Sequence, residues 1–508
     1  MCAGRLIAGR LIRTGLTAVL AVGCLVGMAC SKSDHAAQST TASADDGKIP
    51  TTTRSDEARR EFLAGRDLAE KLQMQESVAH LDKALALDPD FASAELARAN
   101  SAATAKEFFE HMNKAMALVG KTSEGERLLI LANDAAANGD VAKQKEYLDR
   151  LIAIHPNDER ALFNLGNYYF GQQEYEQAIA HYKKATEVAP GFSLAYNLLG
   201  YANRQEGNYA AAEQAFKKYI ELIPADPNPH DSYAELLLKM GRFDESIAQY
   251  RKALSLDPNF VPSYFGISAD LMYQGKHAEA AAELQKMAGM ARNDGELRTA
   301  YFGLAVVAVD NGQLNQAVQH MDHEYAVAEK KNDLAAMAAD LQAKGNIIAE
   351  MQNYDLAQQQ FDRSLQLIEE SSLSQAIKDN AKLQHYFNLT VLAIDKKDYV
   401  AARSHAEEYR AGADSSKNPG QVKLAHELAG RIAFAEKDYN TAITELEQAN
   451  EQDPRNLYRL GQAYQAKGNN AKAQDYCRKA AEFHSLPQLN YAFIRNKARK
   501  NVAAKKAS

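Results

Sequence analysis

The stretch ERALFNLGNYYFGQQEYEQAIAHYKKATEVAPG, residues 159–191, sets the architecture of this chain of 508 residues. Its closing proline belongs to a row in which each member lies 34 residues after the one before: Pro156, Pro190, Pro224 and Pro258. Such a period indicates stacked helix pairs, because one pair of this length is too small to bury its own apolar face. We therefore expect function to come from an extended surface, since units that contact only their neighbours guarantee no central cleft.

Between the prolines, small and aromatic residues recur in fixed columns. The small column holds Ala178, Ala212, Ser246 and Ala280, the ring column holds Tyr175, Tyr209, Phe243 and His277, and turn glycines stand at Gly207, Gly241 and Gly275. Two helices cross closely only where side chains are small, and rings fill the spaces between units. We interpret these columns as packing positions and not as chemistry.

The pattern resembles the tetratricopeptide repeat family, whose unit carries Leu-Gly in its first helix, Ala in its second helix and Pro at its end. The residues that carry the resemblance in 159–191 are Leu162, Leu165, Gly166, Tyr169, Tyr175, Ala178, Tyr182, Ala185 and Pro190. Looser copies cover most of the rest of the chain. The resemblance implies an all-α fold, a right-handed α-α superhelix of about twelve helix pairs.

The spacing divides the chain into regions. Residues 55–292 form an array with the 34-residue period, and residues 293–485 form an array of longer repeats, spaced by about 40 to 45 residues, which we ascribe to longer helices. Residues 486–508 are expected to be a capping helix and a basic tail, because six Lys or Arg residues and no acidic residue follow from Arg495. We interpret that tail as a solvated end.

Residues 1–29 are typical of a signal peptide. Arg5, Arg10 and Arg13 precede an apolar run over residues 16–26, which is shorter than the roughly 18 to 20 residues that span a bilayer. Removal of this segment takes away three positive charges and no negative one, so the net charge moves from −7 to −10. The mature chain is therefore acidic, and nucleic acid is not expected as a partner.

Cys30 resembles the acylated cysteine of bacterial lipoproteins, although Gly27 stands where that family usually has Leu. The resemblance implies a lipid at Cys30, followed by a disordered tether over residues 30–54 that is rich in Ser, Thr, Ala and Asp. The expected location is the cell envelope, on the periplasmic side of the outer membrane. Processing at Cys24, an ordinary cleaved signal, an uncleaved anchor, the inner membrane and the soluble periplasm stay open as alternatives.

Constellations that carry chemistry are weak in this sequence. Gly120 and Lys121 lack the glycine five residues earlier that a phosphate loop needs, because that position is Ala115. His320 and His323 share a helical face but form only a pair. We expect neither an enzyme nor a cofactor nor a metal site.

The expected working part is the groove lined by the first helix of each unit. The resemblance implies that partner segments bind there, against Phe163, Asn167, Phe170, Asn197, Tyr201, Arg204, Asp231, Glu235 and Lys239, with Phe265 and Tyr273 continuing the row. Rings can anchor apolar side chains, and Asn amides can pair with a peptide backbone.

The predicted function is a non-enzymatic protein-protein interaction scaffold, a lipoprotein of the cell envelope whose partners are proteins or peptide segments. The alternative is a ligand-binding accessory lipoprotein of an outer-membrane uptake or secretion system. An enzyme that uses the repeats as a frame is a third reading, and it would need an extra domain that the repeats leave little room for.

Overall fold

The computed structural model describes residues 47–71 and 73–504, and within them the chain forms α-helices, one short 3-10 helix and no strand. In chain order the helices are α2 (Asp56–Glu70), α3 (Met74–Leu87), α4 (Ala92–Asn100), α5 (Ala105–Leu118), η1 (Val119–Lys121), α6 (Glu124–Asn138), α7 (Val141–Ile154), α8 (Glu159–Gly171), α9 (Tyr175–Val188), α10 (Ser193–Gln205), α11 (Tyr209–Leu222), α12 (Pro227–Lys239), α13 (Phe243–Leu256), α14 (Val261–Tyr273), α15 (His277–Gly289), α16 (Asp294–Asp310), α17 (Leu314–Lys330), α18 (Leu334–Glu350), α19 (Tyr354–Glu370), α20 (Gln375–Asp395), α21 (Tyr399–Ser416), α22 (Pro419–Ala435), α23 (Tyr439–Leu446), α24 (Pro454–Ala466), α25 (Asn470–Ala481) and α26 (Leu489–Ala504).

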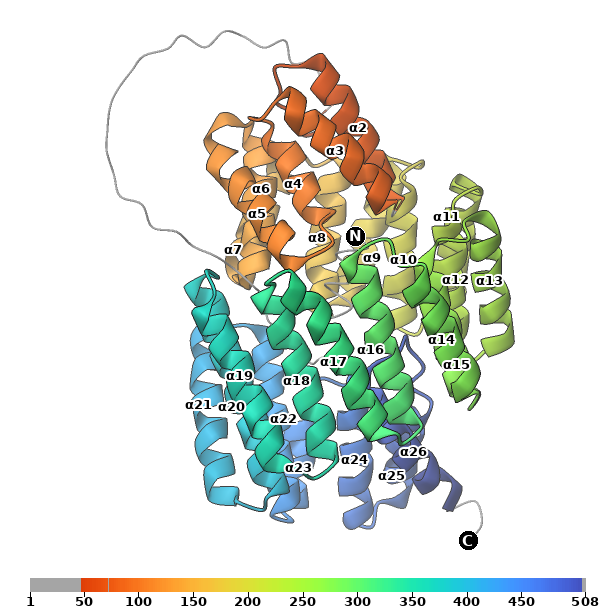
Figure 1. Cartoon of the computed structure of the whole chain (residues 1–508), viewed down its shortest axis with the longest axis vertical. Coiled ribbons are helices and arrows are strands. Elements are labelled where there is room, and N and C mark those ends of the chain that lie inside the picture. Colours follow the sequence, from red (N-terminus) through yellow and green to blue (C-terminus); the bar gives the residue numbers. More distant parts are fainter. Residues whose placement is uncertain (1–46, 72, 505–508) are drawn as a thin grey trace.

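The helices pack as consecutive pairs, from α2 with α3 to α24 with α25 (Figure 1). The described ranges thus hold twelve pairs, here called unit one to unit twelve, and α26 follows the last. The expected all-α superhelix of about twelve helix pairs is confirmed.

The ends of the helices follow local chemistry. Asp158 precedes α8 and its carboxylate accepts hydrogen bonds from the backbone N–H groups of Arg160 and Ala161. Ser123 and Glu126 form a reciprocal capping box at the start of α6. Such caps satisfy N–H groups that have no partner inside the helix.

Gly166 of α8 is small enough to admit a ring from the next helix. A Cβ on Gly166 would lie 2.6 Å from a ring carbon of Tyr182, closer than such atoms approach in proteins. Gly166 of α8 therefore lets the fully buried Tyr182 of α9 pack directly on the helix backbone.

Helices lengthen at the start of unit eight. Those of units four to six have 13 or 14 residues, whereas α16 to α22 have 17 to 21. The wider spacing of signals after residue 293 therefore comes from longer helices. The helices shorten again afterwards, in α23, which ends unit eleven, and in α24 and α25, which form unit twelve.

Successive turns of the superhelix touch each other. The Ser374 hydroxyl of unit ten donates to Asn138 Oδ1 of unit three (3.4 Å), and Lys423 Nζ of unit eleven donates to Gln173 Oε1, which follows α8 of unit four (2.9 Å). Helix α5 of unit two also contacts α18 of unit nine. One turn therefore takes about seven units, and the coil is wound closely rather than being an open ribbon (Figure 1).

Residues 47–54, the described part of the expected tether, differ from a disordered segment. The Ile49 N–H donates to Asp158 Oδ2 (2.9 Å), and the Thr52 N–H donates to Glu126 Oε1 (2.9 Å). Acidic residues that cap α6 and α8 thus also bind residues 47–54, here called the strap, along units three and four. Cys30 and the signal peptide lie outside the described residues.

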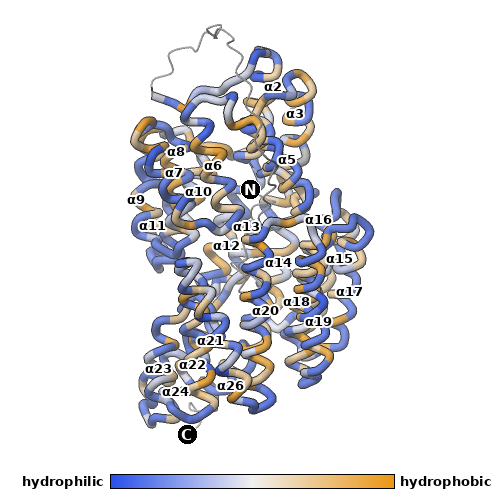
Figure 2. The backbone as a smooth tube through the Cα atoms, turned by 90° about the vertical axis from the view of Figure 1, so that its left-hand side faces the viewer, coloured by the Kyte–Doolittle hydropathy of each residue, from blue (hydrophilic) through white to orange (hydrophobic). Residues whose placement is uncertain are grey.

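The apolar core runs through the whole stack. Figure 2 shows apolar and hydrophilic residues alternating along the helices, as amphipathic helices require. One large cluster of buried residues joins α12 to α18 with α24 and α26, so the last helices share a core with the middle of the chain.

Candidate functional site

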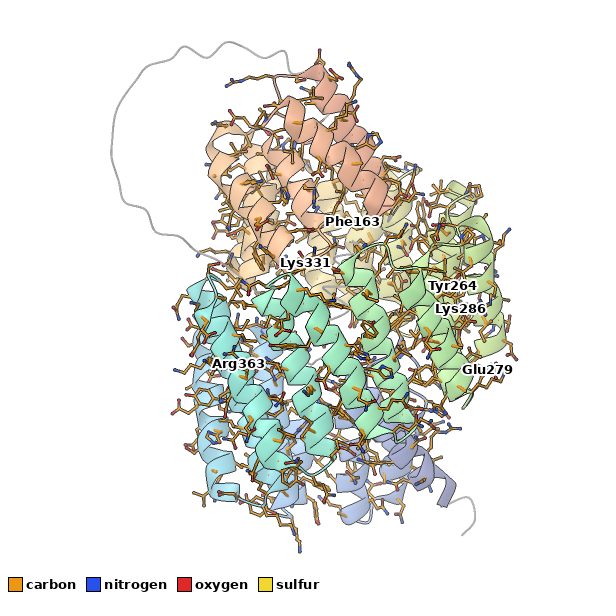
Figure 3. The ribbon with its side chains drawn as sticks, viewed as in Figure 1. Phe163, Tyr264, Glu279, Lys286, Lys331 and Arg363 are labelled. Carbon is orange, nitrogen blue, oxygen red and sulfur yellow. The ribbon has the colours of Figure 1, made fainter. Side chains whose placement is uncertain are left out.

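The inner face of the superhelix is formed by the first helix of each unit. First helices of consecutive units contact each other, as α10 with α12, α12 with α14, α14 with α16 and α20 with α22 do. Apart from α5, which contacts α18, second helices contact chiefly the helices next to them in sequence, so they lie on the outer side of the curve. Glu279, Lys286 and Arg363, on second helices α15 and α19, are exposed accordingly (Figure 3).

Phe163 of α8 lies in the core between units four and five. Its ring centroid is 5.7 Å from that of Tyr182 and 5.5 Å from that of Phe192, and its side chain is buried (Figure 3). The contribution of Phe163 in this arrangement is packing of one unit on the next.

Two positions of α8 keep part of their surface exposed. Asn167 accepts a hydrogen bond from the Tyr182 hydroxyl (2.8 Å), which orients its amide. Phe170 makes an edge-to-face contact with Tyr175, at 5.3 Å between ring centroids. An oriented amide beside a half-buried ring can hold a peptide by its backbone and by an apolar side chain.

Asn197 of α10 occupies the position of Phe163 one unit later and is buried. Its Oδ1 has no hydrogen-bond partner among the described residues. Buried polar atoms usually find a partner, so this oxygen marks a spot where the inner face has unused hydrogen-bonding capacity.

A three-residue network joins units five and six. The Tyr201 hydroxyl donates to Glu235 Oε1 (2.9 Å), and Arg204 lies 3.3 Å from Glu235 Oε2 while its guanidinium stacks 4.7 Å from the Tyr201 ring centroid. Tyr201 and Glu235 are buried, and Arg204 is partly exposed. The predicted groove residues at these two levels therefore contact each other.

The two remaining predicted positions, Asp231 and Lys239, lie on α12 of unit six. Asp231 is buried and accepts a hydrogen bond from the Ser263 hydroxyl (2.8 Å). Lys239 Nζ lies 4.2 Å from the ring centroid of Phe483, and burial, with a smaller effect of Arg204, lowers the pKa of Lys239 to about 8. The structure thus brings all nine predicted residues to the inner helices, and their role in binding a partner stays a prediction.

Two clusters of buried charged groups were not predicted from the sequence. Asp310, at the end of α16, is fully buried and receives hydrogen bonds from Arg495 Nε (2.7 Å to Oδ1) and from the His277 ring (2.8 Å to Oδ2). Burial alone would raise the pKa of Asp310, but hydrogen bonds from His277 and Arg495 hold it below its usual value.

A second charged cluster lies between units eleven and twelve. Glu427 of α22 is buried and accepts from Arg431 Nη2 (2.5 Å) and from the Asn456 amide (3.1 Å). Burial would raise the Glu427 pKa, but Arg431, Arg455 and Arg459 lower it to about 2. Both clusters could have been predicted from the sequence, because each has charged residues within an otherwise apolar first helix.

Asp270 of α14 is a buried acid of the opposite kind. Neither carboxylate oxygen has a hydrogen-bond partner among the described side chains, and burial raises the Asp270 pKa to about 8. At neutral pH this carboxyl group is therefore mostly protonated.

No metal-binding group of three His, Cys, Asp or Glu side chains occurs in residues 47–71 and 73–504. His320 and His323 lie with ring centroids 6.4 Å apart, and burial lowers the pKa of His320. Across the same ranges, none of the helices has the length and apolar character needed to span a bilayer.

Family models described as tetratricopeptide repeat match residues 129–191, 163–227, 203–271 and 454–483. Tetratricopeptide repeats are therefore present in two separate parts of the chain. The matches include α8, α10 and α12, which carry all nine predicted groove residues.

Curated relatives match at low identity. Protein O-mannosyl-transferase TMTC3 of Homo sapiens is 24% identical over 266 residues, which are 49% of this chain and 27% of that protein. Hsp70-Hsp90 organizing protein 3 of Arabidopsis thaliana is 28% identical over 25% of this chain and 22% of its own length. Anaphase-promoting complex subunit 6 of Arabidopsis thaliana is 23% identical over 23% and 22%. This chain spans about a quarter of the length of each of these relatives.

Among solved structures, the anaphase-promoting complex hetero-tetramer Cut9-Hcn1 matches with a TM-score of 0.40 and 17% identity, over 83% of this chain and 76% of that one. A tetratricopeptide repeat protein from Parabacteroides merdae matches with a TM-score of 0.34 and 17% identity, over 56% and 99%.

Proposed function

We propose that this chain is a non-enzymatic scaffold that holds segments of other proteins against the inner face of its helix stack. The observation that carries the proposal is a ladder of hydrogen-bonding side chains, Asn167, Tyr201 and Glu235, at one-unit intervals along α8, α10 and α12. Tyr201 and Glu235 are buried against each other and keep the inner face preformed, and the partly exposed Asn167 amide can pair with a peptide backbone at little cost in reorganisation.

We expect first contact at the predicted groove residues that retain exposed surface. Asn167, Phe170 and Arg204 are only partly buried, and together they offer an amide, a ring and a guanidinium group. These groups suit a segment with an apolar side chain flanked by backbone carbonyls or a carboxylate.

The similarity to proteins whose names describe organising proteins or subunits of a complex supports a scaffold role. Because this chain matches only about a quarter of each relative's length, the proposal does not extend to the partners of those relatives. The matched transferase is covered over 27% of its length, so its activity is not carried over to this chain, and a non-enzymatic role is part of the proposal.

The most direct test places a photo-crosslinking amino acid at Asn167 of the full chain and, as matched control, at Lys217 on the outer helix α11. Lys217 has a side chain that is 61% exposed, so its position is accessible but faces away from the inner helices. We expect protein adducts from position 167 and few from position 217. The identified segment should then bind the purified chain less tightly when Arg204 is replaced by Ala. Equal adduct yields at both positions, or binding that is unaffected by Arg204→Ala, would contradict the proposal.

We also propose that the chain is exported and held by a lipid at Cys30, facing the periplasm from the outer membrane of a bacterium. The basic and apolar residues before Cys30 support this location. In cells, Cys30→Ser should abolish incorporation of a fatty-acid label and move the chain from the membrane to the soluble fraction, whereas Cys24→Ser should do neither. Membrane retention of Cys30→Ser would overturn the lipid anchor.

The alternative, an accessory role in outer-membrane uptake or secretion, would need a ligand pocket. The cavity between units two and eight that Gly295, Arg298 and Val327 help to line has a volume of about 10 Å³, room for about one water molecule. Small-molecule sites are usually larger, about 300 to 1,000 Å³. The scaffold is therefore the function that we put forward.

A further inference from the structure

The C-terminal segment does more than cover the last repeat. Helix α26 packs on α24 and α25 of unit twelve, and it also packs on α16 of unit eight. In Figure 1 these dark blue elements lie beside the green helices of the middle of the chain. Residues 483–497, here called the C-terminal segment, therefore bridge the last unit to units six to nine.

The irregular part of the C-terminal segment contacts aromatic and cationic side chains of units six and seven. Phe483 lies against Lys239 Nζ (4.2 Å to the ring centroid), and the His484 ring lies 4.9 Å from Phe243 and 5.4 Å from Tyr273. The backbone N–H of Ser485 donates to the Tyr273 hydroxyl (3.2 Å). A ring anchor and a backbone hydrogen bond are the means by which grooves of this kind hold a bound peptide.

The helical part of the C-terminal segment contacts acidic groups at the ends of α16 and α18. Arg495 pairs with both carboxylate oxygens of the buried Asp310 and donates to the Met272 carbonyl (3.3 Å). The Asn496 amide donates to the Asp310 carbonyl (2.8 Å), and Lys497 pairs with Glu350. A buried carboxylate that receives a two-pronged guanidinium contact is a geometrically selective recognition element.

We propose that the inner face of units six to nine is a segment-binding site that the chain fills with its own C-terminal segment. The partner segment that fits it has an aromatic residue outside a helix, followed about twelve residues later, as Phe483 is by Arg495, by an arginine on a helix. This inference rests on the proposed scaffold function and specifies a second site and the chemistry of its partner.

A tethered occupant changes how a partner binds. The C-terminal segment follows α25, which ends at Ala481, after the single residue Glu482, so its effective concentration at the site is high, on the order of millimolar for short linkers. A free segment of similar chemistry must compete against that concentration, and the intact chain should bind it weakly. Release of the C-terminal segment should open the site.

The test uses the full chain with a protease recognition sequence inserted after the exposed Glu482. The probe is a fluorescent synthetic peptide of residues 483–508. The uncut chain should give no change in anisotropy, whereas the cut chain, after dilution, should exchange its own fragment for the probe and keep its helical circular dichroism. A probe carrying Phe483→Ala and Arg495→Ala should bind at least tenfold more weakly, and a probe carrying Lys500→Ala, on the exposed side of α26, should bind as the parent does.

Two results would overturn the inference. The first is that the cut chain loses its helical signal and binds no probe, because the C-terminal segment would then be an inseparable part of the fold. The second is that the probe carrying Phe483→Ala and Arg495→Ala binds as tightly as the parent probe. A second measurement on the uncut chain is hydrogen exchange. Amides of residues 483–497 should exchange through a local opening, faster than those of α24 and α25, and exchange only at the rate of global unfolding counts against the proposal.

These outcomes separate the inference from the proposed function. Adducts at Asn167 without probe exchange would remove the C-terminal site and leave the scaffold function at units four and five. Probe exchange without adducts at Asn167 would leave a site for this chain's own segment and remove the proposed partner contact at α8.

Discussion

Contacts between the first helices of units four to six join residues about one repeat apart, whereas the C-terminal segment contacts units seven to nine across 147 to 223 positions of the chain. Tyr201 and Glu235 are separated by 34 residues, and Asp310 and Arg495 by 185. The first contact follows from the repeat, because stacking places equivalent positions of adjacent units side by side. The second depends on how tightly the superhelix winds, which no single unit specifies.

The largest expected effect is at the long-range contact. Replacing Asp310 by Ala leaves Arg495 buried without its carboxylate, and loss of one partner of a buried ion pair typically costs about 3–5 kcal/mol. The free energy of unfolding measured in urea should fall by this amount, with the C-terminal half unfolding first. Glu350→Ala, which removes a more exposed pair with Lys497, is the matched control and should cost roughly 0–1 kcal/mol. Equal losses for the two variants would mean that Asp310 is not a special contact.

The same acid gives a pH dependence with a defined sign. Hydrogen bonds from His277 and Arg495, acting against burial, lower the folded-state pKa of Asp310, so its stabilisation is present above its unfolded pKa and is lost as pH falls through the folded value. In Asp310→Asn this acid limb of the stability curve should flatten. An unchanged acid limb in urea titrations below about pH 4 would contradict the assignment.

Asp270 should make the stability depend on pH in the opposite direction. Because burial raises its folded pKa to about 8, stability should fall as pH rises from the unfolded value near 4 and then level off above about 8. Asp270→Asn removes the charge, and we expect it to be more stable than the parent by on the order of 3 kcal/mol at pH 9 and little different at pH 4. Thermal unfolding at the two pH values measures the difference. If Asp270→Asn is less stable than the parent at both pH values, the Asp270 carboxylate has a stabilising partner in the folded protein, and the prediction is wrong.

Within the repeat itself, Gly166→Ala tests the helix contact of unit four. The added Cβ meets the Tyr182 ring, and overpacking of this kind costs about 1–3 kcal/mol. Gly191→Ala is a suitable control, because a Cβ there has open space around it. If Gly166→Ala has no more effect than the control on the urea midpoint, close packing at this crossing is not required.

The smallest effect is expected for Tyr201→Phe on the inner face. It removes one hydrogen bond to Glu235, which keeps its contact with Arg204, so the loss should be about 1 kcal/mol. Tyr196→Phe, on the half-buried side of the same helix, serves as the comparison for the loss of a hydroxyl. A cost several times larger for Tyr201→Phe would indicate that units five and six depend on this network as strongly as units eight and twelve depend on Asp310.

Much of the local structure was predictable from the sequence. The prolines, the small and ring columns and the turn glycines predicted paired helices of known length, because these signals act within about 34 residues and report packing between neighbours. The nine predicted groove residues lie on first helices for the same reason, and their role in binding stays a prediction. The burial of five of them, Phe163, Asn197, Tyr201, Asp231 and Glu235, was not foreseen, because their exposure depends on how far the curve closes over them.

What the order of residues fixed for this protein is the repeat: which segments are helices, where each begins and ends, and which face of each helix meets the next. What the tertiary structure alone decided is the path of the whole coil, including the strap at residues 47–54, the contacts between successive turns and the docking of Arg495 on Asp310. The physical reason is that small rotations between units add up. Contacts between residues far apart in the chain arise only from their sum.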